Sequence, residues 1–210
     1  MIACLGDLEG KTLIDQDMND PLFVEAVATL MKNETGPTLP EVPGVDLEAY
    51  KAEIIARFAN EKVRDTNQRV ATDAPLAVVL DTVRDQLAAG GSYELLALNT
   101  AAWIRRFAVD KNQTGGDIVT KHAVKDQLIA AARTGKNEPN AVFALTGVFG
   151  DLGQEKQFVA AVRAYMHMLD KEGVRATLAQ AVENSKVAVQ RNTTPAVRPQ
   201  TTSAPDLSKR

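Results

Sequence analysis

The segment YELLALNTAAWIRRFAV, residues 93–109, decides the fold class. At 3.6 residues per turn, its apolar side chains cover most sides of a helix instead of a single stripe. A helix that is apolar on most sides is usually the buried centre of a bundle. We therefore expect an all-α protein that packs around this segment.

The chain before this segment also carries helical signals. Residues 75–89 repeat apolar side chains at helical spacing, and Gly90 and Gly91 follow where that helix must end. Ser92 is then the expected N-cap of the central helix.

Two earlier helices begin at recognisable caps. Asp20 is the expected N-cap of one helix, with Pro21 at its first position, and Asp46 caps another that runs to about residue 60. Residues 36–46 lie between them and hold three prolines and two glycines. Because each proline removes a backbone donor, we expect an extended connector there.

The second half of the chain predicts further helices and a tail. Gly173 separates the last two of the helices expected at residues 119–133, 140–146, 154–171 and 174–189. Past Asn192 the chain is rich in Pro, Thr and Ser and holds almost no apolar residue, so it cannot build a core. We expect a helical domain over residues 1–190 and an extended tail over residues 191–210, with other protein chains as its partners.

The composition excludes several classes of protein. The 210 residues are 45% hydrophobic and 24% charged, with a net charge of −3, which argues against a nucleic-acid-binding surface. No apolar run is long enough to span a membrane. The single cysteine, Cys4, cannot form an intrachain disulfide, and the first ten residues do not resemble a secretory signal. We expect an intracellular, reducing compartment.

The sequence offers few groups for catalysis or metal binding. It has no GxGxxG or Walker loop, no GxSxG elbow and no HExxH motif. His122 and His167 have no neighbouring cysteine, so we predict no metal site. Asp15 and Asp17 are interpreted as solvated loop charges, and Cys4 as a small buried residue.

Two groups of arginines allow two interpretations each. Arg105 and Arg106 beside Trp103 suggest either a stacked anion site or a core tryptophan whose neighbours reach charged partners, and composition favours the second. Arg57, Arg64 and Arg69 recur on neighbouring turns. They either line an anion or polyol pocket or form ordinary helix salt bridges with Glu53, Glu61 or Asp65.

Several segments, in order, resemble the long-chain polyol dehydrogenases, the family of mannitol dehydrogenases and fructuronate reductases. Residues 37–73 are similar to the start of that family's C-terminal domain, which has a Pro-rich connector followed by Asp-Leu-x-x-Tyr, Arg-Phe-x-Asn and Gln-Arg-Ile-x-x-Asp. Further similar pieces are MIACLGDLEGKTLIDQDMNDP at 1–21, AWIRR at 102–106, VFGDL at 148–152 and GVRATL at 173–178. The resemblance therefore covers residues 1–180.

The resemblance implies a fold and a chemistry. The fold is a multi-helix domain similar to the C-terminal domain of 6-phosphogluconate-type dehydrogenases, which forms one wall of the substrate cleft. In the family a separate Rossmann domain binds NAD(P). A lysine in a Lys-x4-Asn-x2-His motif is the general base, without metal. On this basis Arg69 and Arg64 are the candidate substrate-binding residues.

The chain departs from the family in three ways. It starts just past the place of the Lys-x4-Asn-x2-His motif, and Lys11 is followed by Asp15 and Gln16 instead. It also contains no nucleotide-binding domain, so we expect no catalytic residue and no NAD bound by this chain alone. The family places a lysine eight residues after the arginine that matches Arg69, whereas this chain has Ala77, which has no donor.

These departures favour a non-catalytic derivative of the mannitol dehydrogenase C-terminal domain that acts as a structural or interaction subunit of a larger assembly. The alternative is the substrate-domain half of a split or truncated NAD-dependent polyol dehydrogenase. A third hypothesis is a helical regulatory module unrelated to dehydrogenases, which requires the ordered matches to be coincidental.

Overall fold

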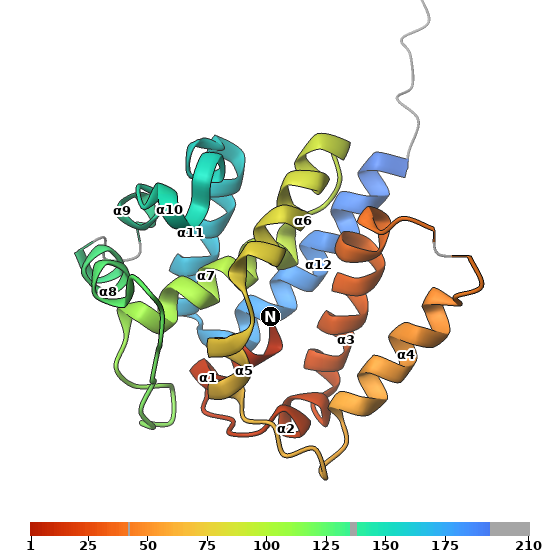
Figure 1. Ribbon diagram of the computed structural model, residues 1–210, viewed down its shortest axis with the longest axis horizontal. Coiled ribbons are helices and arrows are strands. Elements are labelled where there is room, and N and C mark those ends of the chain that lie inside the picture. The colour runs from red at the N-terminus through yellow and green to blue at the C-terminus, as the bar shows by residue number, and fades with distance from the viewer. Residues whose placement is uncertain (42, 135–137, 194–210) are drawn as a thin grey trace, which may run out of the picture.

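A computed structural model describes residues 1–41, 43–134 and 138–193. Within these ranges the regular structure is helical, and two isolated β-bridges join loop segments. The predicted all-α fold class is confirmed (Figure 1). The first half contains α1 (Ile2–Glu9), α2 (Ile14–Met18), α3 (Pro21–Leu30), a π-helical turn η1 (Met31–Thr35), a 3₁₀ turn η2 (Gly36–Thr38), α4 (Leu47–Phe58), α5 (Asn67–Asp73) and α6 (Leu76–Ala89). The second half contains α7 (Glu94–Ala108), α8 (Lys125–Thr134), α9 (Asn140–Phe143), α10 (Thr146–Phe149), η3 (Gly150–Gln154), α11 (Lys156–Lys171) and α12 (Gly173–Thr193).

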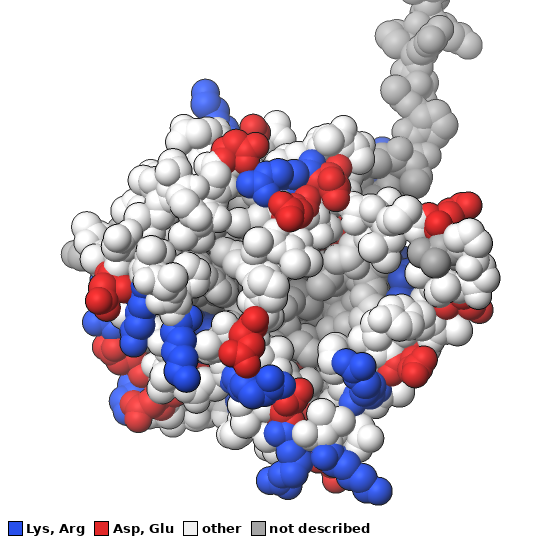
Figure 2. Space-filling view, in the orientation of Figure 1, with Lys and Arg blue, Asp and Glu red and all other residues white. Residues whose placement is uncertain are grey.

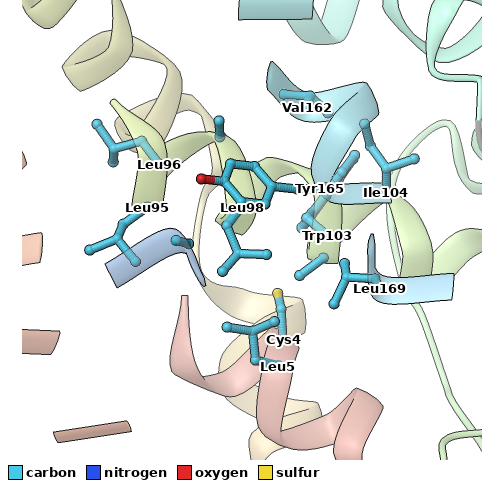
Figure 3. Packing of buried hydrophobic residues seen from close by; sticks show 14 of the residues in the cluster. Cys4, Leu5, Leu95, Leu96, Leu98, Trp103, Ile104, Val162, Tyr165 and Leu169 are labelled. Carbon is cyan, nitrogen blue, oxygen red and sulfur yellow. The ribbon is translucent and has the colours of Figure 1, made fainter. Parts of the chain in front are cut away.

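Helix α7 is the centre of the fold, as residues 93–109 predict. It packs against α1, α6, α8, α11 and α12, and most of its residues are buried. Figure 3 shows α7 side chains such as Leu98 and Ile104 meeting Cys4 and Leu5 of α1 and Leu169 of α11. The prediction of a small buried Cys4 is confirmed, and the helix that is apolar on most sides does lie inside a bundle.

The tryptophan and its two arginines follow the second of their two interpretations. Trp103 is buried and packs against the ring of Phe107, with ring centroids 4.7 Å apart. Arg105 lies 2.6 Å from a carboxylate oxygen of Asp170, and Arg106 forms a buried ion pair within the core. These side chains hold helices together instead of forming an anion site.

The N-terminus of α7 is capped by a residue that the sequence did not indicate. Ser92 does not cap it, because its hydroxyl donates to the carboxylate of Glu34 at 3.1 Å. Glu34 is fully buried and accepts from the backbone N–H groups of Leu95 and Leu96 at 3.0 and 2.9 Å. A carboxylate at a helix N-terminus is stabilised by the unpaired N–H groups and the helix dipole. Burial nevertheless raises the pKa of Glu34, against these hydrogen bonds.

Other predicted helix ends are confirmed. The Asp20 carboxylate accepts from Leu22 N–H at 3.1 Å, and Pro21 is the first residue of α3. Asp46 caps α4 through two backbone N–H groups. Gly90 follows the end of α6, and Gly173 is the first residue of α12. Their φ angles are positive, 65° and 79°, a conformation that glycine adopts without steric cost.

Some boundaries differ from the predictions. The helix expected from residue 119 begins only at Lys125, because the ring of His122 accepts from Val124 N–H and forms a local turn. The segment expected as one helix at 140–146 is divided between α9 and α10, and part of the extended connector forms η2. Helix α12 reaches Thr193, and the rest of the predicted tail lies outside the described residues. None of the helices described here is long and apolar enough to cross a membrane.

Candidate functional site

A cavity of about 180 Å³ lies beside the first turn of α1. It is enclosed by α1, α2, the end of α4, the loop after α4 and α5. Its apolar walls come from Ile2, Ala3, Ile14, Phe58, Val63 and Val70, and its polar groups from Asp15, Asn60, Arg64 and Asp65. Figure 2 shows that this face of the molecule is hollowed at its centre, with mostly uncharged atoms in the floor and charged side chains around it.

Two short backbone pairings build this cavity. Ile14 N–H donates to the carbonyl of Asp65 at 2.9 Å, and Asn67 N–H donates to the carbonyl of Thr12 at the same distance. They bring the start of α2 beside the loop that precedes α5. Arg64 in this loop has φ of 52°, the one non-glycine residue with positive φ among those that the structure describes.

The two predicted substrate-binding residues have different surroundings. Arg64 lines the cavity, whereas Arg69 is not among the lining residues. The guanidinium of Arg69 forms ion pairs with Asp65 and, at 3.4 Å, with Asp73. Of the two interpretations of these arginines, the helix salt bridge with Asp65 is present for Arg69. Ala77, at the place of the family's lysine, is exposed on α6.

The prediction that Asp15 and Asp17 are solvated loop charges is wrong. Both lie on α2, with 9% of Asp15 and none of Asp17 exposed. Asp15 lines the cavity, whereas Asp17 is not among its lining residues. The physical reason is that the short helix α2 is packed against α1 and α3, a tertiary arrangement that local sequence spacing does not encode.

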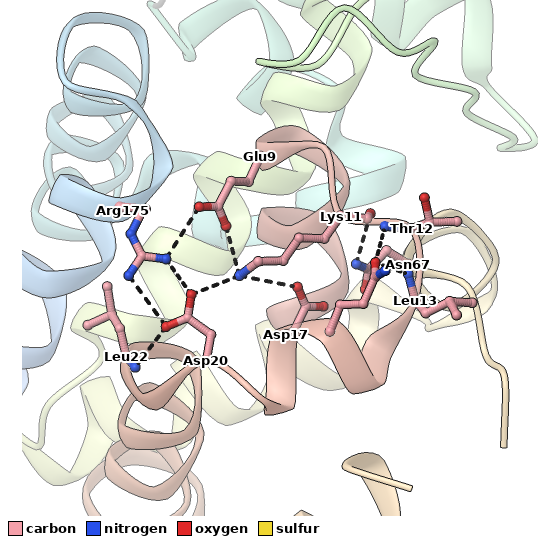
Figure 4. A network of polar contacts seen from close by, with 10 residues as sticks. Glu9, Lys11, Thr12, Leu13, Asp17, Asp20, Leu22, Asn67 and Arg175 are labelled. Carbon is pink, nitrogen blue, oxygen red and sulfur yellow. Dashed lines mark hydrogen bonds and ion pairs between the residues drawn. The ribbon is translucent and has the colours of Figure 1, made fainter. Parts of the chain in front are cut away.

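A network of charged side chains surrounds Asp17 (Figure 4). The Lys11 ammonium lies 3.0 Å from carboxylate oxygens of Glu9 and Asp20 but 3.9 Å from Asp17. Arg175 of α12 binds Asp20 from the other side. The network therefore joins α1, the start of α3 and α12.

Two aspartates of this network, the buried Asp17 and the partly buried Asp20, have opposite shifts in pKa. Burial raises the pKa of Asp17 to about 7, although Asn67 and Lys11 oppose the shift. Burial also acts on Asp20, but hydrogen bonds from Arg175, Lys11 and the Leu22 N–H outweigh it and lower the pKa of Asp20 to about 2. Asp17 is thus the group in this network whose charge changes near neutral pH.

Gly6 permits the close approach of α1 to this network. A Cβ atom at Gly6 would lie 2.3 Å from Asn67 Nδ2 and 2.4 Å from Asp17 Oδ1. Such distances are too short for any side chain, so a glycine is required here. Asn67 also donates to the Lys11 carbonyl at 3.1 Å, which holds α5 against the end of α1.

Sequence reasoning missed most of this network. From the sequence, Lys11 is only a lysine without the Asn and His of the family's motif, and Arg175 is only part of a family-like segment. No local pattern links these residues, because they are about 160 positions apart in the chain. The available signal is the sequence GDLEGKTLIDQDMND itself, which places five acidic residues within nine positions of a single lysine.

Comparison with known protein families finds a match over most of the chain. The sequence profile of the mannitol dehydrogenase C-terminal domain matches residues 1–170. The chain belongs to this family. The result rules out a helical module unrelated to dehydrogenases.

Individual relatives agree with this assignment. D-mannonate oxidoreductase of Escherichia coli is 35% identical over 183 residues, which cover 85% of this chain and 38% of the relative. Mannitol 2-dehydrogenase of Phaeosphaeria nodorum is 30% identical over 83% of this chain and 31% of the relative. The mannitol dehydrogenase C-terminal domain described here thus spans about a third of the length of these relatives.

Solved structures show the same fold. Mannitol 2-dehydrogenase of Pseudomonas fluorescens, solved as a ternary complex with NAD and D-mannitol, superposes with a TM-score of 0.81 at 26% identity. The match covers 87% of this chain and 38% of that structure. A substrate-free D-sorbitol dehydrogenase at 20% identity gives a TM-score of 0.73 and supports the fold alone.

Two glycine pairs of this mannitol dehydrogenase C-terminal domain lie in helix ends and turns. Gly90 and Gly91 end α6, and Gly115 and Gly116 belong to a turn closed by the Asn112 side chain. No strand leads into either pair in the described ranges, so neither can cradle a diphosphate as a nucleotide-binding loop does. Among the same residues no three His, Cys, Asp or Glu side chains gather as metal ligands.

Proposed function

We propose that this chain is a non-catalytic derivative of the mannitol dehydrogenase C-terminal domain that acts as a structural or interaction subunit. The observation that carries the proposal is the state of Arg69. Its guanidinium is bound by Asp65 and Asp73 at the surface, and the residue eight positions later is the exposed Ala77.

A polyol site needs hydrogen-bond donors that are free to reach hydroxyl groups. The two carboxylates occupy donors of Arg69 with charge-assisted hydrogen bonds, which are stronger than those that a neutral hydroxyl accepts. Ala77 supplies no donor. The cavity that Asp65 lines has mostly apolar walls, which leave the many hydroxyls of a polyol unpaired. This combination supports a domain that keeps the family fold without a working polyol site.

The surface around α4 supports an interaction role. Helix α4 buries none of its residues, and it lies at the edge of the molecule beside α3 (Figure 1). Leu39, Val45 and Tyr50 in and before α4 are 52%, 48% and 55% exposed. Large exposed apolar side chains are typical of protein-binding surfaces when they form a patch. We propose other protein chains as the partners, not nucleic acid, in an intracellular, reducing compartment.

The second candidate is the substrate-domain half of an NAD-dependent polyol dehydrogenase. One observation favours it: Arg64 lines the cavity and forms no hydrogen bond or ion pair with another described residue. In this case Arg64 and Arg69 bind the substrate, and residues outside this chain supply the general base and bind NAD.

Reconstitution separates the two candidates. The full chain is co-expressed with the part of E. coli D-mannonate oxidoreductase that lies outside the match, and NADH formation from D-mannonate is measured. The C-terminal part of the E. coli protein, supplied in the same way, is the positive control. The proposal predicts no turnover with this chain. Turnover that Arg69→Ala abolishes would establish the enzyme half instead.

A further inference from the structure

A flank of α4 presents apolar side chains to solvent. Ile55 and Phe58 pack against the hydrophobic core, and the helix lies against α2 and α3. Leu47, Tyr50 and Ile54 recur at i, i+3 and i+7, so they share a second flank of the helix. Tyr50 is 55% exposed, and no residue of α4 is buried. Because an amphipathic helix normally buries its apolar side chains, this flank is suited to a partner.

The charge along α4 and its flanking loops changes sign from one end to the other. Residues 41–53 hold four acidic side chains and a single lysine, whereas residues 54–64 hold three basic side chains and a single glutamate. The acidic half consists of the exposed Glu41, Asp46, Glu48 and Glu53, and the basic half of the exposed Arg57, Lys62 and Arg64. Figure 2 shows basic side chains gathered at the side of the molecule where α4 ends in Figure 1.

The basic half has no partner of its own. Arg57, Lys62 and Arg64 form no ion pair with another described residue. In the acidic half, the lysine is Lys51, which lies 2.7 Å from Glu48. Glu53 forms no ion pair within the described part of the chain. Both halves therefore keep exposed charge that a partner of suitable charge distribution can pair with.

This charge distribution fits a second copy of the chain. When two identical helices pair antiparallel about a two-fold axis, the first half of each lies against the second half of the other. The acidic half of each α4 then faces the basic half of its partner, and the two apolar flanks meet between them. A parallel pairing would place like charges together, which is unfavourable.

We propose that two copies of this chain form a symmetric dimer through antiparallel pairing of their α4 helices. This inference rests on the proposed interaction function and names the partner. With 12 residues, α4 is about 18 Å long, so the contact is small. Small interfaces are typical of weak and transient association, and we expect a dimer of micromolar affinity.

Sedimentation velocity of the full chain at increasing concentration tests the proposal. We expect a reversible change from the mass of one chain to the mass of two, and a weaker dimer at high salt. Tyr50→Lys should weaken the dimer by at least about tenfold, because it places a charge in the apolar contact. The matched control is Val78→Lys on α6, where the valine is 62% exposed, and it should leave the dimer unchanged.

Charge variants test the antiparallel arrangement. The double variant Glu41→Lys/Glu53→Lys makes both halves basic, and Arg57→Glu/Lys62→Glu makes both halves acidic. Each variant alone should stay monomeric, whereas an equal mixture of the two should dimerise as the parent chain does. The four side chains are exposed and form no ion pair among the described residues, so the changes spare the fold, which circular dichroism checks.

Three results would overturn the inference: a parent chain that stays monomeric, a Tyr50→Lys variant that dimerises as the parent does, or a mixture of charge variants that stays monomeric. The inference is also wrong if α4 binds the part of E. coli D-mannonate oxidoreductase outside the match and Tyr50→Lys abolishes that binding. None of these measurements uses NADH formation, so failure of the dimer is distinguishable from failure of the non-catalytic role.

Discussion

Asp7 and Arg106 form an ion pair in the middle of the bundle, with Arg106 Nε 2.8 Å from Asp7 Oδ2. Arg106 is 1% exposed and also donates to the carbonyls of Ala71 and Val119 at 3.3 and 3.1 Å. One side chain thereby joins α1, α5, α7 and the loop before α8. Because the guanidinium has partners on three sides, its charge is compensated within the core.

Removing one partner of this pair should destabilise the fold strongly. Asp7→Asn leaves a buried guanidinium without its counter-charge, and we expect a loss of about 3–5 kcal/mol in the free energy of unfolding. Urea denaturation measures it. The control is Asp110→Asn, which breaks an exposed pair with Arg133 and should cost less than about 1 kcal/mol. Equal losses in the two variants would contradict the buried role of Asp7.

Asp17 should make stability depend on pH between about 4 and 7. Its pKa is raised to about 7 in the folded state from an ordinary value of 3.8. Folding therefore takes up a proton in this range, and the free energy of unfolding falls as pH rises from 3.8 to about 7. The slope due to one such group is at most about 1.4 kcal/mol per pH unit.

The variant Asp17→Asn isolates this effect. It has no group that titrates at this position, so its stability relative to the parent chain should increase from pH 4 to pH 7 and stay level above that. Denaturant unfolding at several pH values measures the difference. A difference that stays constant with pH would show that Asp17 does not titrate in this range.

Gly6→Ala should destabilise the protein by about 1–3 kcal/mol, because the new methyl group collides with Asn67 and Asp17. Gly147→Ala is the matched control. A Cβ at Gly147, in α10, meets no atom within 4 Å, so this change should be neutral or stabilise by up to about 1 kcal/mol. Thermal unfolding compares the two. If Gly6→Ala is as well tolerated as Gly147→Ala, α1 does not pack closely against the Asp17 network.

Glu34→Ala should expose the role of the long-range cap on α7. The change leaves the N–H groups of Leu95 and Leu96 buried without an acceptor, at about 1–3 kcal/mol for each group. Ser92→Ala removes only a hydroxyl that donates to Glu34 and should cost about 1 kcal/mol. Chemical denaturation distinguishes the residues. A larger loss for Ser92→Ala would restore Ser92 as the principal residue at this helix end.

The sequence predicts those parts of the fold that depend on neighbouring residues. Asp20 and Asp46 cap helices whose N–H groups lie two or three positions away, and the central helix is recognisable from its own residues. Glu34 could not be predicted as the cap of α7, because it is about 60 residues from the N–H groups that it binds. Local patterns contain no information about such a partner.

The same distinction applies to the candidate site. Arg64 and Arg69 were identified by resemblance, but their different partners follow from tertiary structure. The segment around Asp15 and Asp17 predicts solvated charges, whereas the packing of α2 between α1 and α3 buries them. The burial of a charged residue depends on which helices cover it, and single-sequence spacing does not specify that.

The central claim is that this domain keeps the family fold without a working polyol site. The most direct test is a chimera in which residues 1–170 of this chain replace the matching segment of E. coli D-mannonate oxidoreductase, with D-mannonate-dependent NADH formation as the measurement. We predict that kcat/KM falls by about a hundredfold or more, with a folded protein by circular dichroism, and that Ala77→Lys recovers part of it. A chimera within about tenfold of its parent, which corresponds to only about 1.4 kcal/mol of transition-state stabilisation, would contradict the claim.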